Sequence, residues 1–158
     1  MKKQTIVLFD IDYTLFDTGT FKKSNLLDHS LYSEVLPVIK ELSKKYILGI
    51  FSEGETSFQK EKLRKTKILD LFIASHVNIV EKKDLMLEKI LKKYKNYKII
   101  LVDDKLSVLH KAKMISPFIS TIWVKRGKYA ESQLPIENFS SDVIIENLKN
   151  IVSIIDKM

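Results

Sequence analysis

Residues 5–12 read TIVLFDID, and this stretch decides the fold class. Residues 6–9 form an apolar run with the length and composition of a buried strand, and Asp10 and Asp12 follow it directly. Carboxylates this close repel one another, and they resist burial unless a partner neutralises them. A buried strand that ends on two acids therefore predicts a site at which they hold something positively charged.

The composition is that of a globular intracellular protein. The chain has 158 residues, of which 45% are hydrophobic and 30% charged, so we expect one domain spanning residues 1–158. It has no cysteine, which excludes disulfides and thiolate metal sites. The apolar run near the amino terminus is too short for a signal peptide, and no later run has membrane-spanning length. We expect a soluble, cytoplasmic protein with no membrane partner.

The net charge of +7 raises the question of a nucleic-acid partner. Only Arg64 and Arg126 are arginines, and the remaining basic residues are lysines scattered along the chain. Arginine is the better residue for bidentate recognition of phosphates and bases. We therefore interpret the charge as a solvated surface, consider nucleic acid an unlikely partner, and expect a phosphorylated substrate.

Strand-like apolar runs alternate with helical patterns along the chain. The expected strands are residues 6–9, 47–51, part of 72–80, 98–102, 121–124 and 143–145. The expected helices are one near Pro37, residues 56–65, one capped by Asp84, residues 106–114 and residues 148–155. We interpret residues 127–141 as a loop. This alternation predicts an α/β fold with a Rossmann-like parallel sheet and helices on both faces.

Polar residues stand where three of these strands end. Asp10 follows the first strand, Ser52 the second, and Asp103 and Asp104 the fourth. Ligands of a parallel α/β sheet bind beyond the carboxyl ends of its strands, so these side chains should share a crevice. Asp12 could face the same crevice, because residues i and i+2 of an extended chain point the same way. Oxygen ligands without cysteine or clustered histidine favour magnesium over zinc.

These residues resemble the motifs of the haloacid dehalogenase (HAD) superfamily of phosphohydrolases, over nearly the whole chain. The first motif, Asp-x-Asp-x-Thr, stands as Asp10-Ile11-Asp12-Tyr13-Thr14. The second is the strand ending at Ser52, and the fourth is the strand ending at Asp103 and Asp104. Softer similarities are residues 59–63, QKEKL, and residues 122–127, IWVKRG. Each motif alone is weak, but the ordered set at successive strand ends is specific.

The third motif of this family is a lysine before a helix, often followed by proline. Residues 81–84 read EKKD, so two lysines compete for the position. We favour Lys82, because Lys83 then occupies the usual place of the proline, and we interpret Lys83 as an ordinary surface lysine.

The resemblance implies a role for each matched residue. Asp10 would be the nucleophile that forms an aspartyl-phosphate, and Asp12 the acid and base. An acid at the position of Asp12 is typical of the phosphatases and is missing in the branch that attacks carbon–halogen bonds. The phosphate-binding residues would be Thr14, Ser52 and Lys82. The ligands of Mg²⁺ would be Asp10, Asp12 through its backbone carbonyl, Asp104, and Asp103 either directly or through a water molecule.

Many members of the family carry a cap domain over the substrate, but this chain has no room for one. Both the segment from Asp17 to Pro37 and that from Ser52 to Lys82 are shorter than the roughly 40 residues that an independent core needs. The site should be open unless residues 21–36 or a second subunit cover it. Residues 18–20 could be a flap or a plain turn. The substrate stays open, with a large or nucleotide-like phosphate ester among the possibilities.

Two other functions compete with a magnesium-dependent phosphomonoester hydrolase. Asp103 and Asp104 also resemble the acid pair of a phospho-acceptor receiver domain, but that pair should open the domain and here it comes late. The chain could also be a catalytically idle binding module that kept the fold. The complete set of acids argues against an idle module.

Overall fold

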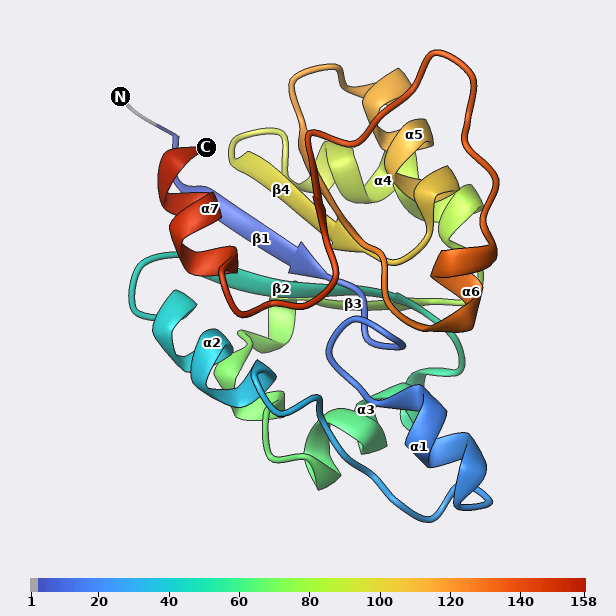
Figure 1. Cartoon of the computed structure of the whole chain (residues 1–158). Helices are drawn as coiled ribbons and strands as arrows, with labels where there is room; N and C mark the ends of the chain where they lie inside the picture. The colour runs from blue at the N-terminus through green and yellow to red at the C-terminus, as the bar shows by residue number, and fades with distance from the viewer. Residues whose placement is uncertain (1–2) are drawn as a thin grey trace.

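Six strands form one sheet in the computed structural model, which describes residues 3–158 (Figure 1). The strands are β1 (Thr5–Phe9), β2 (Ile47–Glu53), β3 (Val77–Val80), β4 (Lys98–Asp103), β5 (Ser120–Val124) and β6 (Val143–Ile145). Their order across the sheet is β3-β2-β1-β4-β5-β6, and every neighbouring pair is parallel. The predicted parallel α/β fold is confirmed.

Helices cover both faces of the sheet because its strands are apolar on both sides. The α-helices are α1 (Thr18–Lys23), α2 (Val35–Leu42), α3 (Thr56–Lys65), α4 (Lys83–Lys93), α5 (Leu106–Ile115), α6 (Gly127–Ser132) and α7 (Ile151–Lys157). Two short 3₁₀ turns, η1 (Leu69–Leu71) and η2 (Ala74–His76), lead into β3. One core lies between the sheet and α2, α3 and α7, and the other between the sheet and α4 and α5 (Figure 1). In β1, Val7 and Phe9 enter the first core, whereas Ile6 and Leu8 enter the second.

The strand order places a crevice at the end of β1. The chain leaves β1 for β2 on one side and later returns to β4 on the other side, so the winding direction reverses between β1 and β4. Loops diverge at such a switch point and leave room for a ligand beyond the carboxyl ends of the strands. Phe9 pairs with Val102 of β4, which brings Asp10 level with Asp103.

Three local predictions differ from the structure. Residues 127–132 form α6 although a loop was expected, and residues 18–20 begin α1 instead of forming a turn or flap. The side chain of Asp17 caps α1 by accepting a hydrogen bond from the backbone N–H of Thr20. Asp84 was expected to cap α4, but the helix begins at Lys83, so Asp84 lies inside its first turn.

The described residues contain no separate cap domain. The segment between β1 and α2 holds only α1 and loops. The segment between β2 and β3 holds α3 and the two 3₁₀ turns. Residues 21–36 therefore contain no independent unit, although Phe21 is buried against the core. Across residues 3–158, no helix combines the length and hydropathy needed to cross a membrane.

Candidate active site

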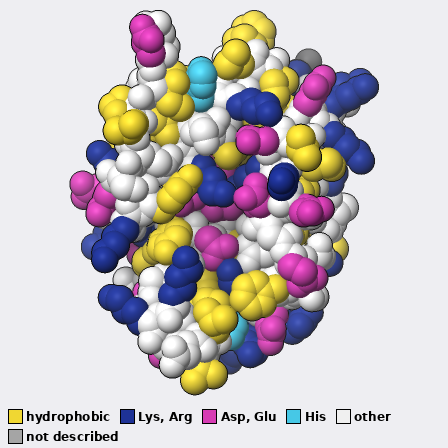
Figure 2. Space-filling model, turned by 90° about the vertical axis from the view of Figure 1, so that its right-hand side faces the viewer, with side chains coloured by type: hydrophobic (Ala, Val, Ile, Leu, Met, Phe, Trp, Pro, Cys, Tyr) yellow, Lys and Arg dark blue, Asp and Glu magenta, His cyan; other side chains and the backbone are white. Residues whose placement is uncertain are grey.

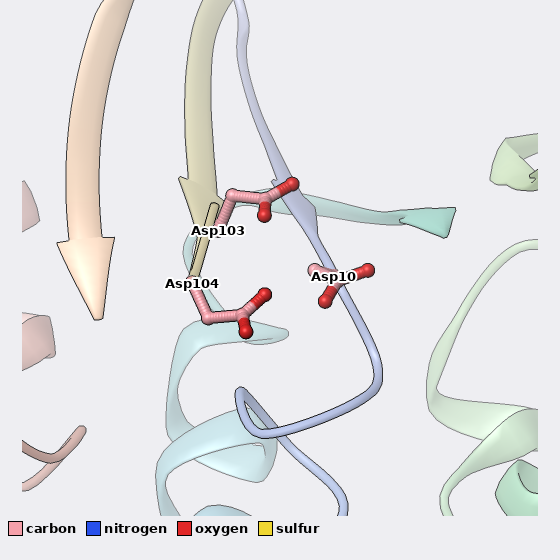
Figure 3. Close-up of side chains that lie close together, drawn as sticks. All are labelled: Asp10, Asp103 and Asp104. Carbon is pink, nitrogen blue, oxygen red and sulfur yellow. The ribbon is translucent and has the colours of Figure 1, made fainter. Parts of the chain in front are cut away.

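Three buried carboxylates meet at the switch point of the sheet. Asp10 follows β1, Asp103 is the last residue of β4, and Asp104 comes next (Figure 3). One carboxylate oxygen from each lies within 4.8 Å of the others. All three residues are at most 5% exposed. This is the oxygen-only ligand set that the strand ends predict, and it has the charge to hold a hard divalent cation.

Lys83 holds this cluster together, so the choice of Lys82 as the lysine of the site was wrong. The Lys83 ammonium lies 2.6 Å from Asp10 Oδ1 and 2.6 Å from Asp103 Oδ2. Its side chain is 2% exposed, whereas Lys82 is exposed and lies outside the cluster. The backbone N–H of Lys83 also donates to Glu53 Oε2 over 2.8 Å, which fixes the start of α4 against the end of β2.

The helical register explains why Lys83 turns inward. The buried face of α4 contains Leu87, Ile90 and Leu91, and Lys83 lies four residues before Leu87 on that same face. Lys82 precedes the helix in an extended conformation. The spacing of these apolar residues was the signal in the sequence that could have identified Lys83.

Burial and crowding shift the protonation of the cluster. Burial raises the pKa of Asp10 to about 6, although Lys83 opposes the shift. Burial raises the pKa of Asp104 to about 9, and the charges of Asp10 and Asp103 add to the effect. Burial alone would lower the pKa of Lys83, but the two carboxylates outweigh it and hold that pKa above its usual value. One ammonium therefore does not neutralise three carboxylates, and a divalent cation would complete the balance of charge.

Asp12 occupies a different environment in the same cleft. Its carboxylate accepts hydrogen bonds from Lys62 Nζ at 2.7 Å, Gln59 Nε2 at 2.9 Å and Thr18 Oγ1 at 2.8 Å. Burial would raise the pKa of Asp12, but Lys62 outweighs it and holds this pKa below its usual value. The Asp12 carboxylate is therefore held by side chains of α1 and α3 and not by the three-acid cluster. Ligation of a metal by the Asp12 backbone carbonyl stays a prediction.

Helix α3 supplies two of the three side chains that hold Asp12. Lys62 is 5% exposed at its side chain, and its Nζ lies 5.2 Å from the Phe16 ring centroid and 4.9 Å from that of Phe58. Gln59 reaches back over the end of β2 because Gly54 leaves room: a Cβ there would lie 2.9 Å from Gln59 Cγ. Residues 59–63 were noted only as a softer similarity, and the contacts of Gln59 and Lys62 with Asp12 were not predicted.

The predicted phosphate-binding residues Ser52 and Thr14 are both buried. Ser52 Oγ accepts a hydrogen bond from Gln59 Nε2 at 3.0 Å, so its own proton is available to another acceptor. Thr14 is 0% exposed, and its Oγ1 has no hydrogen-bond partner among the described residues. Neither residue lines the open cleft, and their roles toward phosphate stay predictions.

Further side chains fix the backbone around the acids. Trp123 Nε1 and Gln133 Nε2 both donate to the backbone carbonyl of Asp104, at 2.9 and 2.7 Å. Trp123 is also buried in the second core. Glu53 lines the cleft and pairs with Lys105, whereas Glu55 caps α3. Gln133 carried no signal in the sequence.

The acids lie at the bottom of a cleft of about 520 Å³ that opens to solvent. Asp10, Asp12 and Asp104 all line it, so the expected sharing of one crevice by both acids of the first motif is confirmed. Figure 2 views this side of the molecule, with acidic side chains near the centre of the face and basic and hydrophobic ones around them. Without a further positive charge, the buried carboxylates would repel an anion that approached them.

Comparison with known proteins gives structural matches but no sequence matches. No protein-family model matches the sequence. No curated protein matches it either.

Solved structures of HAD-like hydrolases share the fold over almost the whole chain. A haloacid dehalogenase-like hydrolase from Burkholderia xenovorans superposes with a TM-score of 0.81 at 20% identity, covering 98% of both chains. The HAD-hydrolase YfnB from Bacillus subtilis, solved with magnesium, has a TM-score of 0.73 at 11% identity, covering 98% of this chain and 100% of its own. A predicted phosphoglycolate phosphatase from Haemophilus somnus has a TM-score of 0.71 at 14% identity, covering 98% of this chain and 99% of its own.

The fold and the buried acids define the class to which the structure corresponds. The chain has the haloacid dehalogenase-like hydrolase fold, and the resemblance found in its motifs is confirmed at the level of the fold. Structures with this fold include a 2-haloacid dehalogenase from Pseudomonas syringae, with a TM-score of 0.65 at 14% identity, covering 99% of both chains. The fold alone therefore does not choose between phosphate and halide chemistry.

Proposed function

We propose that this protein is a magnesium-dependent phosphomonoester hydrolase that works through an aspartyl-phosphate on Asp10. The carrying observation is the division of its carboxylates into two groups within one cleft. Asp10, Asp103 and Asp104 form a buried cluster suited to a metal, while Asp12 is held separately by α3. A nucleophile beside a metal and an independent acid–base group are the parts that phosphoryl transfer between oxygens needs.

In the first step Asp10 attacks phosphorus. A bond forms between a carboxylate oxygen of Asp10 and phosphorus, and the bond from phosphorus to the leaving alcohol breaks. The electron pair stays on the leaving oxygen, and Asp12 supplies its proton. Lys83 stabilises the negative charge around Asp10 through its buried ammonium. The substrate's own negative charge beside Asp12 opposes Lys62 and favours the protonated form that this step requires.

In the second step water replaces Asp10. Asp12, now a carboxylate, accepts a proton from a water molecule, and the water oxygen attacks phosphorus. The bond between phosphorus and Asp10 breaks, which releases inorganic phosphate and restores the carboxylate. The hydrogen bonds from Gln59 and Thr18 keep Asp12 oriented for both proton transfers.

The acidic cluster fits Mg²⁺. Its ligand atoms are all carboxylate oxygens. Burial and the charges of Asp10 and Asp103 raise the pKa of Asp104 to about 9, and this crowding of acids supports a cation there. When bound, the ion would screen the phosphate from the carboxylates and allow two anions to approach. The residues that would hold it are Asp10, Asp103 and Asp104, with the Asp12 carbonyl as a further proposed ligand.

Asp12 also argues for phosphate over halide chemistry. A halide leaves without a proton, whereas an alkoxide needs one, so an acid held for proton transfer has a purpose only in the first reaction. Three residues in two elements hold Asp12, which is more than a solvent-facing acid requires.

The direct test is hydrolysis of p-nitrophenyl phosphate by the purified protein. We expect turnover with Mg²⁺ or Mn²⁺ and none in excess EDTA, and Asp10→Asn should remove nearly all of it. Release of halide from a 2-haloacid without phosphatase activity would assign the chain to the other chemistry. Equal rates with and without EDTA would refute the metal site.

A further inference from the structure

The walls of the cleft differ from its acidic floor. Besides the three acids, half of the residues that line the cleft have aromatic or aliphatic side chains, which come from separate segments of the chain: Tyr13, Phe21, Leu26, Phe58 and Tyr129. Phe58 is 41% exposed, Tyr129 48% and Leu26 51%, so water now covers a large apolar surface. Hydrophobic side chains on the face viewed in Figure 2 flank the central acids. An apolar rim at a phosphate site is a feature that phosphate binding itself does not explain.

Tyr13 is the wall residue nearest in sequence to the acid that would protonate the leaving group. Its φ of 59° is in the left-handed region, which is unfavourable for tyrosine. Its ring lies against Gly127 at the start of α6, where a Cβ would approach the ring to 2.8 Å. Lys22 Nζ lies 5.7 Å from the centroid of the same ring. The fold thus maintains a strained residue whose ring lines the cleft beside Asp12.

The polar groups of the walls are largely committed to protein partners. Lys62 and Thr18 bind Asp12, and Lys105 pairs with Glu53 at 3.3 Å. A leaving group rich in hydroxyls would find only Lys22 and the hydroxyls of Tyr13 and Tyr129 without a hydrogen-bond partner among the described residues, so it would regain only part of its hydrogen bonds to water. A flat aromatic ring would instead find aromatic faces and would cover apolar surface.

We infer that the substrate is a phosphomonoester whose leaving alcohol carries a flat aromatic ring, which packs on Tyr13, Phe58 and Tyr129. The inference rests on the proposed function, since it concerns the leaving group of the same reaction. A nucleoside monophosphate and an arylmethyl phosphate share this chemistry but place the ring at different distances from phosphorus. The cleft volume of about 520 Å³ can accommodate either.

The test compares substrates that differ in the ring but share the type of leaving oxygen. The first pair is adenosine 5′-monophosphate and ribose 5-phosphate, and the second is benzyl phosphate and ethyl phosphate. Stacking of a base on an aromatic side chain predicts a kcat/KM ratio of roughly 5- to 100-fold in favour of the ring. A preference for adenosine 5′-monophosphate in the first pair indicates that the ring binds far from phosphorus. A preference for benzyl phosphate in the second pair indicates that it binds close to phosphorus. Either result supports the inference. Ratios near one in both pairs would overturn it.

Substitutions on the cleft wall test where the aromatic ring of the substrate binds. Phe58→Leu and Tyr129→Leu should each reduce the ratio of the preferred pair severalfold. Phe118→Leu is the matched control, because Phe118 is 95% exposed and lies outside the cleft, so its ratio should equal that of the wild type. Equal reductions in all three variants would show that the ring does not bind at this rim.

Binding separates a wrong substrate class from a wrong reaction. With Asp10→Asn and Mg²⁺, calorimetry should show tighter binding of the aromatic member of one pair, by the same roughly 5- to 100-fold. Such binding without hydrolysis by the wild type would refute the proposed reaction and keep the inferred ligand class. Equal binding of both members in both pairs, with hydrolysis intact, would refute only the ligand class.

Discussion

At the scale of single residues, the site depends on one buried lysine. The Lys83 ammonium touches two of the three carboxylates in the cluster, and no other lysine ammonium pairs with them among residues 3–158. Removing one partner from a buried charge network leaves the others uncompensated, at a cost of about 3–5 kcal/mol. Its neighbour Lys82 is exposed, and an exposed lysine contributes about 1 kcal/mol or less.

This difference predicts opposite outcomes for two adjacent substitutions. Lys83→Met should lower kcat by roughly 10²–10³-fold, since a donor to developing negative charge is lost. Lys82→Met should stay within about twofold of the wild type. Steady-state kinetics with Mg²⁺, together with circular dichroism to confirm folding, make the comparison. A folded Lys83→Met protein with wild-type turnover would remove Lys83 from the mechanism.

At the scale of elements, strand ends could be predicted and helix contacts could not. Asp10, Ser52, Asp103 and Asp104 follow apolar runs directly, and the parallel arrangement brings such positions to one edge of the sheet. Two of the three partners of Asp12, Gln59 and Lys62, come from α3, about 50 residues along the chain. Their approach depends on how α3 packs beyond β2, which periodicity alone does not specify.

The same limit explains the error at Lys82. Lys82 was favoured because Lys83 then occupies the usual place of the proline in the family pattern, and the expected cap at Asp84 placed the helix too late. Once the helix begins at Lys83, the buried stripe of α4 includes that residue. The loop expected at residues 127–141 is confirmed for residues 133–141 and wrong for residues 127–132, which form α6. This helix is only six residues long, and Gln133 at its end is held by contacts with Leu106 and Asp104.

The contact between Lys62 of α3 and Asp12 should influence the pH dependence of activity. Lys62 holds the pKa of Asp12 below its usual value, so Lys62→Met should raise that pKa. If Asp12 must be protonated to donate, the limb at which kcat/KM falls with rising pH should move to higher pH by about one unit or more. The matched control is Lys65→Met, on the same helix but 52% exposed at its side chain. Superimposable profiles for all three proteins would contradict the role of Lys62.

At the scale of the whole molecule, the acidic cluster links metal, pH and stability. In the folded metal-free protein the pKa of Asp10 is about 6 and that of Asp104 about 9, both above the ordinary value of 3.8. The folded state therefore holds protons that the unfolded chain has lost. The stability that these protons contribute is present below pH 4 and is lost as the pH rises through 6 and then 9.

Thermal unfolding at pH 6 and pH 8 measures this linkage. In EDTA the melting temperature should fall by several degrees between the two, since each 1 kcal/mol shifts it by roughly 2–4 °C. Mg²⁺ should raise it more at pH 8, because the ligands must lose their protons to bind. Asp104→Asn should weaken both effects, and the exposed Asp70→Asn should not change them. A Mg²⁺ shift that survives in Asp104→Asn would place the ion elsewhere.

The proposed mechanism requires that Asp10 carry the phosphoryl group during turnover, and this intermediate can be trapped. The protein is mixed with Mg²⁺ and a substrate labelled in its phosphate, quenched in acid during turnover, digested and analysed by mass spectrometry. We expect a hydroxylamine-sensitive phosphate on the peptide that contains Asp10, lost in Asp10→Asn together with turnover. Sustained hydrolysis by Asp10→Asn, or phosphate on a different residue of the wild type, would contradict it.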